Sequence, residues 1–390
     1  MKFTAAMLPD DVAEAVLVGR LLLDEGPTPV LIRDGAVEDV SRAAPTIADL
    51  MEMEDTAGVA GERLCGIDEL ALMPRERFLA PVDLQAVKAA GVTFAISAIE
   101  RVIEERARGD FRRAGEIRDK LEQRIGGAIR SVVPGTEGAA RLKDALIDEG
   151  LWSQYLEVAI GPDAEIFTKT APLASVGWGA EIGIRSDSSW NNPEPEVVLV
   201  VNSRGEIRGA TLGNDVNLRD FEGRSALLLS KAKDNNASSA IGPFVRLFDD
   251  RFTLDDVRSA VVELEIDGRD GFRLRGQSRM SEISRDPEDL VRQAMSEHHY
   301  PDGFVLFLGT LFAPTEDRGE AGRGFTHKIG DDVRISTASL GTLANIVSTS
   351  RDAPAWAFGT RALMRNLAGR GLLAEIPASL HGGRQGGLSH

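Results

Sequence analysis

The chain has 390 residues, 43% of them hydrophobic and 27% charged, which is typical of a globular protein and excludes a fibrous or low-complexity chain. Its formal net charge of −16 argues against a nucleic-acid-binding surface, and an anionic ligand would need a local cation to offset this charge. No apolar run reaches the roughly 18 residues that span a membrane, and a single cysteine, Cys65, excludes an intramolecular disulfide. We therefore expect a cytoplasmic protein with no membrane or nucleic-acid partner.

Residues 1–75 are expected to form a small N-terminal α+β domain. Apolar segments at 16–23 and 29–33 lie on either side of a turn rich in Asp, Gly and Pro, which is typical of paired strands. Residues 46–53 predict a short helix. A larger catalytic domain is expected to follow at residues 76–373.

The segment 97–150 is rich in Glu, Arg and Ala and is expected to be helical. Apolar residues recur at helical spacing up to residue 125, and residues 141–151 form a second helical stretch. We expect these helices to be an insertion that acts as a lid. A solvated helical hairpin that only packs against the domain is an equally good interpretation.

From residue 156 onward the chain is predicted to be mostly β. Strands are expected at 182–184, 196–201, 261–266, 303–308 and 332–335. Short helices are expected at 219–230, 255–259 and 286–296. The polar, glycine-rich tail at 374–390 is predicted to be disordered. The fold class is therefore α+β, with more strand than helix.

Two glutamates, Glu194 and Glu196, stand two residues apart at the start of a predicted strand. Side chains alternate along a strand, so both carboxylates project to one face, and the two prolines beside them stiffen an extended backbone. Two like charges are costly together unless a cation lies between them, and hard oxygen ligands favour Mg²⁺, Mn²⁺ or Ca²⁺. A solvated strand face is the alternative, and it is the more common one for such a pair alone.

Two further groups carry chemistry. Asp215 follows a strand-like segment at 207–212 and would supply a third carboxylate, leaving positions open for water and substrate. A plain Asn/Asp turn that caps a helix is the alternative. Lys233, nine residues before Gly242, would serve as base, acid or oxyanion partner. A surface lysine paired with Asp234 is the alternative there.

The order and spacing of these residues resemble the fumarylacetoacetate hydrolase family. Glu-X-Glu, then Asn-Asp-Val-X-X-Arg-Asp, then Lys with Gly-Pro nine residues on, occur in sequence at 194–243. Other blocks similar to that family lie at 165–169, 302–310, 329–335 and 341–347. The resemblance covers roughly residues 79–372.

The resemblance implies a mixed β-roll catalytic domain that binds a divalent metal, usually Mg²⁺ or Mn²⁺. It implies that Glu194, Glu196 and Asp215 are the metal ligands. It places around the substrate Lys233, Gly242 and Thr310, and it implies that Lys169 hydrogen-bonds a ligand or the substrate. It also implies a homodimer or homotetramer.

One departure from the family concerns the water-activating residues. Hydrolases of the family carry an Asn-Tyr-X-X-His-X-X-Glu pattern, and residues 93–100 correspond to it here, with Ser97 in place of the histidine. Serine does not act as a base at neutral pH without help, which argues against hydrolysis. Glu100 is still available as an acid or base.

Segments at 91–94, 100–106 and 187–196 resemble the 2-keto-3-deoxy-pentonate dehydratase branch of the family. That branch implies a lyase that dehydrates 2-keto-3-deoxy-D-xylonate, which is the same compound as 2-dehydro-3-deoxy-D-arabinonate, to 2-oxoglutarate semialdehyde. The sequence does not choose between Glu100 and Lys233 as the base. Ser97 is expected to contact the substrate. Arg185, Ser186 and Arg101 are candidates to anchor the far hydroxyl or carboxylate, and an ordinary surface position is an equally good interpretation of each.

Two alternative functions remain open from the sequence. Acylpyruvate hydrolysis or oxaloacetate decarboxylation would use the same metal, although Ser97 argues against the hydrolysis. A non-catalytic sugar-acid-binding protein is the alternative from another class, and the complete set of charged residues at 194, 196, 215 and 233 disfavours it.

Overall fold

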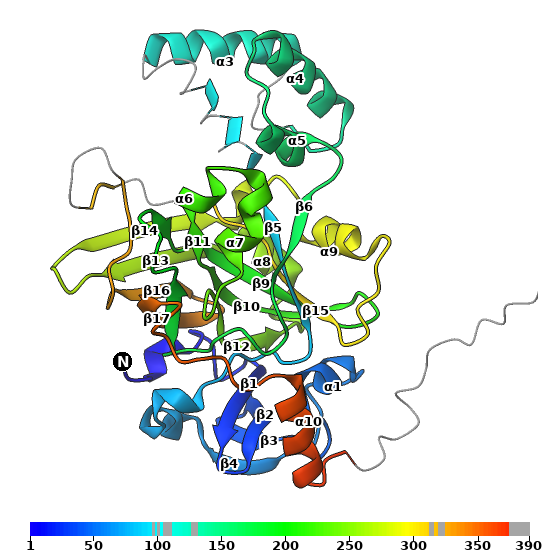
Figure 1. The fold of residues 1–390 in the computed structure, drawn as a ribbon. Helices are drawn as coiled ribbons and strands as arrows, with labels where there is room; N and C mark the ends of the chain where they lie inside the picture. Colours follow the sequence, from blue (N-terminus) through cyan, green and yellow to red (C-terminus); the bar gives the residue numbers. More distant parts are fainter. Residues whose placement is uncertain are drawn as a thin grey trace, which may run out of the picture.

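The computed structural model describes residues 1–95, 98–99, 102–103, 111–125, 132–311, 316–318 and 324–373. Two large sheets and a two-stranded one form the body of the molecule, and a group of helices lies at one end (Figure 1). The tail at 374–390, which we expected to be disordered, lies outside the described residues, as does part of the predicted lid at 97–150. Within the described ranges, no helix is both long enough and apolar enough to cross a membrane.

The strands form three sheets, and both large sheets combine parallel with antiparallel pairs. The order in the ten-stranded sheet is β4 (Glu62–Gly66), β3 (Ala36–Asp39), β2 (Gly26–Arg33), β1 (Leu17–Leu23), β12 (Ser239–Leu247), β10 (Ile207–Asp215), β9 (Pro195–Val201), β15 (Phe304–Phe307), β5 (Ala86–Gly91) and β6 (Glu165–Thr170). The order in the five-stranded sheet is β14 (Arg273–Arg279), β13 (Val261–Asp267), β16 (Asp332–Thr337), β17 (Gly341–Thr349) and β7 (Glu181–Ile184). The two-stranded sheet pairs β11 (Asn217–Leu218) with β8 (Asn191–Asn192).

Helices are fewer and mostly short. The α-helices are α1 (Ile47–Glu52), α3 (Phe111–Ile125), α4 (Glu137–Asp148), α5 (Gln154–Ile160), α6 (Arg219–Glu222), α7 (Leu229–Lys233), α8 (Leu254–Ser259), α9 (Pro287–Met295) and α10 (Thr360–Gly369). The 3-10 helices are η1 (Ala5–Met7), η2 (Ile67–Leu72), η3 (Arg75–Arg77), η5 (Ala226–Leu228) and η6 (Met280–Glu282). More of the described residues lie in strands than in helices, so the predicted α+β, mostly β fold class is confirmed. Both large sheets are open and do not close into a barrel.

Strand β9 lies within the ten-stranded sheet, and both of its faces are buried. Val197, Leu199 and Val201 pack in the core that this sheet shares with the five-stranded sheet. Val198 and Val200 pack on the opposite face, against α1 and the N-terminal strands. Burial on both faces explains why this strand is a continuous apolar run rather than an alternating one.

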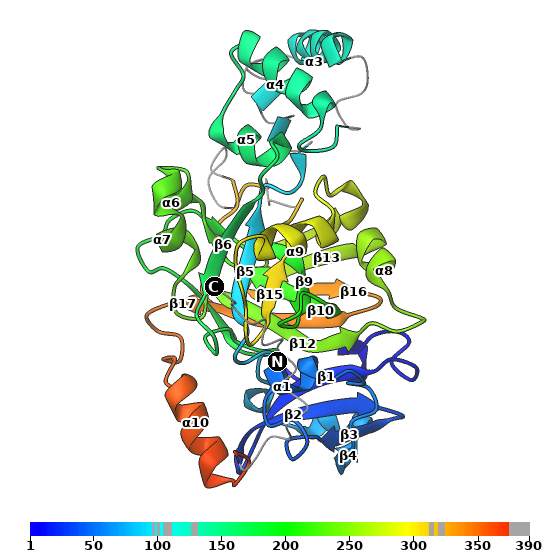
Figure 2. The same cartoon turned by 90° about the vertical axis from the view of Figure 1, so that its right-hand side faces the viewer.

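The first four strands continue the large sheet, because β1 pairs with β12 in an antiparallel ladder. Helix α10 lies beside these strands in both views (Figures 1 and 2). Asn366 Nδ2 donates to the carbonyl of Glu25 at 2.7 Å, and Arg370 Nη1 donates to that of Pro27 at 2.9 Å. The N-terminal strands therefore contact the end of the catalytic segment, and the division at residue 75 stays a prediction.

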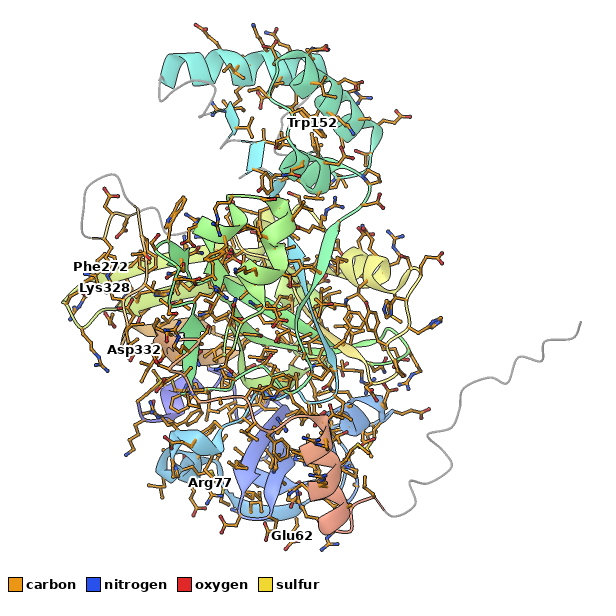
Figure 3. All side chains as sticks on the ribbon, in the orientation of Figure 1. Glu62, Arg77, Trp152, Phe272, Lys328 and Asp332 are labelled. Carbon is orange, nitrogen blue, oxygen red and sulfur yellow. The ribbon has the colours of Figure 1, made fainter. Side chains whose placement is uncertain are left out.

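Helices α3, α4 and α5 form a group with its own small core. Leu121, Leu142 and Leu156 are buried in it, one from each helix. Trp152 lies among these helices, next to α4 and α5 (Figure 3), and Lys143 Nζ is 4.9 Å from its ring centroid. The helical character that we predicted is thus confirmed for the described residues, whereas a lid function stays a prediction.

Most of the predicted elements are present. Strands were expected and are found as β1, β2, β7, β9, β13, β15 and β16. The predicted helix at 219–230 is instead broken, since α6 ends at Glu222 and a new turn starts after Ser225. The Ser225 hydroxyl accepts the N–H of Leu227 at 3.2 Å, and such a cap favours a new helix start over continuation.

Arg285 joins the helical group to the sheets. Its buried guanidinium donates to the carbonyls of Val158, Gly161 and Asp163 at 2.6–3.0 Å, where α5 ends. These carbonyls lie at or just beyond the helix end, where backbone acceptors have no partner within the helix. One charged side chain therefore satisfies three backbone acceptors.

We expect Arg285→Met to lower the free energy of unfolding by about 2–4 kcal/mol, because buried carbonyls lose a charged donor. Urea denaturation of the full chain measures this change. The matched control is Arg279→Met at an exposed position of β14, which should change stability by less than about 0.5 kcal/mol. Equal effects of the two substitutions would contradict the assigned role of Arg285.

Candidate metal centre

The ends of several strands meet at one edge of the ten-stranded sheet. Because β9 and β10 are antiparallel, the start of β9 lies beside the end of β10, with Glu196 opposite Gly213. The start of β12 lies beside Asp215, and the end of β15 lies beside the start of β9. On the next strands, Gly91 at the end of β5 is opposite Glu165 at the start of β6. Polar residues that are distant in sequence are thereby brought to one place.

Three carboxylates lie together at this edge: Glu194 directly before β9, Glu196 within it, and Asp215 at the end of β10. One oxygen of each lies within 4.8 Å of the others. Glu196 and Asp215 are each 2% exposed. The strand β10 extends through Asp215 instead of ending at Leu212, so the alternative interpretation of Asp215 as a turn residue is wrong.

Hydrogen bonds orient two of these carboxylates. Glu196 Oε2 accepts the backbone N–H of Gly309 at 2.7 Å. Glu194 Oε1 accepts Asn217 Nδ2 at 3.0 Å, and the same nitrogen donates to Glu222 Oε2 at 2.6 Å. One oxygen of Glu194 and one oxygen of Glu196 are therefore each held by a donor from another segment of the chain.

Two buried lysines supply positive charge to the cluster. Lys169 Nζ lies 2.8 Å from Asp215 Oδ1, and Lys169 is fully buried. Lys233 Nζ lies 3.0 Å from Asp215 Oδ2 and donates a short hydrogen bond to Glu194 Oε2. Lys169 thus contacts one carboxylate, and Lys233 connects two.

Two ammonium groups do not balance three carboxylates. Burial, together with Asp215 and Glu194, raises the pKa of Glu196 well above its ordinary value. Burial also raises the pKa of Glu194 to about 7, against the attraction of Lys233. For Asp215, burial alone would raise the pKa, but Lys169 and Lys233 lower it.

The two lysines respond in opposite directions. Burial lowers the pKa of Lys169, although Asp215 partly compensates. Burial also opposes the charge of Lys233, but Asp215 and Glu194 raise its pKa well above the ordinary value. Lys233 is therefore a hydrogen-bond donor to the carboxylates in the metal-free protein.

The donor set fits a divalent cation. Carboxylate oxygens are the ligands preferred by Mg²⁺, Mn²⁺ and Ca²⁺. Burial, and then repulsion among the carboxylates, raises the pKa values of Glu194 and Glu196, and a bound cation would offset both effects. The carboxylates of Glu194, Glu196 and Asp215 would hold that ion.

Two of the predicted substrate residues lie in segments next to those that carry the carboxylates. Thr310 directly follows Gly309, whose N–H binds Glu196. Gly242 lies on β12, paired with Leu212 of β10. Gly242 therefore lies on a strand next to β10, and Thr310 lies in the segment after β15 that binds Glu196.

The other predicted substrate residues lie farther out or are not described. Arg185 and Ser186 follow β7, and Arg185 pairs with Asp187 at 2.8 Å. The guanidinium of Arg185 lies 5.2 Å from the ring centroid of Phe221 on α6. Outside the described residues lie Ser97, Glu100 and Arg101.

Glu165 is a candidate that the sequence interpretation did not single out. It shares a strand face with Phe167, since alternate residues of β6 point the same way up to the register shift next to Lys169. Phe167 lies 5.9 Å from Lys233 Nζ, and Lys169 contacts Asp215, so this face is turned to the cluster. Burial, and then Glu222, raise the pKa of Glu165. The register shift next to Lys169 interrupts the period of two in β6, so local sequence carried no clear signal for Glu165.

Metal-free protein should lose stability as the pH rises through the titration of Glu194. This carboxyl ionises near 4.5 when unfolded and near 7 when folded, so the folded state binds more protons between these values. The free energy of unfolding should therefore fall across this window, by up to about 3 kcal/mol. Urea denaturation in EDTA at pH 5 and pH 8 measures it. Glu194→Gln should make this fall smaller, while Glu196, whose pKa is also raised, still contributes in the same direction. Glu263→Gln, at an exposed site on β13, should leave the fall unchanged. Equal slopes for the two variants would contradict the assignment.

Two curated proteins are similar to this chain over most of its length. A probable 2-keto-3-deoxyxylonate dehydratase of Haloferax volcanii is 29% identical over 330 residues, which are 81% of this chain and 94% of that protein. A 2-dehydro-3-deoxy-D-arabinonate dehydratase of Saccharolobus solfataricus is 28% identical over 313 residues, 78% of this chain and 87% of that protein.

Solved structures share the fold. A 2-keto-3-deoxy-D-arabinonate dehydratase complexed with magnesium and 2,5-dioxopentanoate matches with a TM-score of 0.62 at 24% identity, covering 85% of this chain and 99% of its own. A fumarylacetoacetate hydrolase from Exiguobacterium antarcticum matches with a TM-score of 0.53 at 16% identity, covering 86% of this chain and 100% of its own. At these identities the likeness shows the fold alone.

A family model decides the wider relationship. The model described as fumarylacetoacetate (FAA) hydrolase C-terminal matches residues 143–348, which is more than half of the chain. That range contains the three clustered carboxylates and both buried lysines. The chain belongs to the fumarylacetoacetate hydrolase family.

Proposed function

We propose that this chain is a hydro-lyase that converts 2-keto-3-deoxy-D-xylonate, the same compound as 2-dehydro-3-deoxy-D-arabinonate, to 2-oxoglutarate semialdehyde. Its cofactor would be Mg²⁺ or Mn²⁺, held by Glu194, Glu196 and Asp215. The observation that carries the proposal is this buried carboxylate cluster in a chain whose two curated relatives are dehydratases of that compound. The solved dehydratase of the same fold contains magnesium and 2,5-dioxopentanoate, which is another name for 2-oxoglutarate semialdehyde.

The reaction removes a proton from carbon 3 and the hydroxyl from carbon 4, and the double bond then shifts to give a terminal aldehyde. A bound divalent cation would polarise the 2-keto group and so acidify the carbon-3 protons. Lys233 donates to Glu194 and lies 3.0 Å from Asp215, so its ammonium group is placed to donate hydrogen bonds and stabilise negative charge on substrate oxygens. Of the roles that the sequence left open for Lys233, this favours acid or oxyanion partner over base.

Glu165 is our candidate for the acid–base group. Its carboxyl shares the face of β6 that meets the cluster, and its raised pKa brings it closer to the operating pH. A carboxylate there accepts the carbon-3 proton, and the resulting acid returns a proton to the leaving carbon-4 hydroxyl. Glu100 stays the alternative from the sequence.

A cluster of cations beyond the carboxylates supports an anionic substrate. Phe221 of α6 has three cations near its ring, with Arg224 at 4.6 Å, Arg185 at 5.2 Å and Lys231 at 5.4 Å from the centroid. The next residue, Glu222, connects through Asn217 to the ligand candidate Glu194. We propose that these cations offset the net charge of −16 where the substrate enters.

The remaining expectations belong to this proposal too. We propose a homodimer or homotetramer in the cytoplasm, with a small-molecule sugar acid as its ligand and no nucleic-acid or membrane partner. Ser97, Ser186 and Thr310 are proposed to contact the substrate.

Metal-stripped protein is expected to form 2-oxoglutarate semialdehyde from 2-keto-3-deoxy-D-xylonate only after Mg²⁺ or Mn²⁺ is added. An NAD-dependent aldehyde dehydrogenase couples the product to a spectrophotometric signal. Glu196→Gln should lower kcat/KM by about a hundredfold or more, since even residues behind the ligands change activity 10–100-fold. The Glu263→Gln protein should match the wild type. Consumption of acylpyruvate or oxaloacetate in place of the sugar acid would overturn the dehydratase assignment but keep the metal centre. Binding of the sugar acid without turnover would indicate a non-catalytic protein.

Glu165→Gln should lower kcat by about 10²–10⁴-fold, the usual contribution of a general acid or base, with little change in metal affinity. Steady-state kinetics and isothermal titration with Mn²⁺ separate the two effects. Glu297→Gln, at an exposed site after α9, is the matched control. Wild-type kcat in the Glu165 variant would leave Glu100 as the acid–base candidate.

A further inference from the structure

The peptide bond between Leu308 and Gly309 lies between a buried threonine and a ligand candidate. Its carbonyl accepts the hydroxyl of Thr93 at 2.7 Å. Its N–H donates to Glu196 Oε2 at 2.7 Å. Thr93 is 1% exposed. A single peptide plane therefore links Thr93 to Glu196.

The geometry of Gly309 is adapted to this link. Its φ of +88° lies in the left-handed region, where a side chain is unfavourable. A Cβ atom at this position would lie 2.2 Å from Thr93 Oγ1 and 3.1 Å from the carbonyl oxygen of Ala90. Glycine therefore allows the close approach of the threonine hydroxyl to this peptide.

The segment that carries Thr93 is held in a strained conformation. Val92 has a φ of +53°, which is rare for a β-branched residue and costs on the order of 1–3 kcal/mol. Ser284 holds the segment from both sides, because its N–H donates to the Thr93 carbonyl at 2.9 Å and its hydroxyl accepts the N–H of Ala95 at 2.8 Å. Such strain persists only where surrounding contacts fix it, and it concentrates at functional sites.

We propose that Thr93 is a positioning residue of the metal centre, whose hydroxyl orients the Leu308–Gly309 peptide so that its N–H holds the Glu196 carboxylate for the cation. This inference rests on the metal centre of the proposed function. It adds a residue that touches neither the ion nor the substrate.

The physical basis is a short chain of hydrogen bonds. A peptide group whose carbonyl accepts a hydrogen bond donates more strongly through its own N–H. A bond from that N–H to a carboxylate is charge-assisted and fixes the rotation of the carboxylate. With Oε2 held, the orientation of Oε1 is set before the cation binds. Groups that orient metal ligands in this way typically change metal affinity 10–100-fold.

The test is a titration of the metal-stripped full chain with Mn²⁺, followed by electron paramagnetic resonance of the free ion. Thr93→Val removes the hydroxyl at nearly constant volume and should weaken Mn²⁺ binding about tenfold or more. Thr93→Ser restores the hydroxyl and should bind within about threefold of the wild type. The matched control is Thr211→Val on β10, a buried threonine whose hydroxyl has no hydrogen-bond partner among the described residues, and it should bind as the wild type does.

Glu196→Gln separates this inference from the metal centre itself. If the wild type binds Mn²⁺, Glu196→Gln does not, and Thr93→Val binds as the wild type does, the metal centre stands and the role of Thr93 is overturned. Equal losses in Thr93→Val and Thr93→Ser would overturn it too, because the hydroxyl would then not be the cause. A wild type that binds no Mn²⁺ would overturn both. Thermal unfolding checks that each variant folds, and Thr93→Ala takes the place of the valine variant if that one does not.

Discussion

Repulsion among three clustered carboxylates, of which Glu196 and Asp215 are buried and Glu194 is half-buried, is the constraint on which the metal centre depends. One oxygen of each carboxylate lies within 4.8 Å of the others, and water has little access to Glu196 and Asp215, so their charges are poorly screened. Lys169 and Lys233 compensate only part of the charge. Such an arrangement is stable in a folded protein when its partners are held rigidly, because removing one partner leaves an uncompensated buried charge.

The sheet supplies this rigidity. The strand β9 is buried on both faces for its whole length, so the backbone that carries Glu196 is fixed by apolar packing a few residues away. Gly213, opposite Glu196 on β10, leaves space that the Phe307 ring fills, since a Cβ atom there would lie 2.3 Å from the ring. The carboxylates thus lie at the end of an otherwise apolar part of the sheet. The packing of these apolar residues fixes the backbone positions of the strands that carry the carboxylates.

Contacts between distant segments connect this centre to the helical group. Ser284 holds the segment after β5, and the next residue, Arg285, holds the end of α5. The same short stretch of chain therefore contacts both the segment that reaches the Leu308–Gly309 peptide and the helices beyond it. The helical group and the segment that reaches this peptide are thus held by adjacent residues.

Much of this protein is determined by local sequence alone. The period-two alternation placed Glu194 and Glu196 on one face, and the apolar runs predicted most strands. The resemblance of several blocks to the fumarylacetoacetate hydrolase family implied the three carboxylate ligands. Only the tertiary structure decided which residues from other strands complete the site. Glu165, the Gly309 N–H and Thr93 reach it through strand pairing across long stretches of chain. The physical reason is that periodicity is a property of neighbouring residues, whereas register between distant strands is set by the packing of the whole sheet.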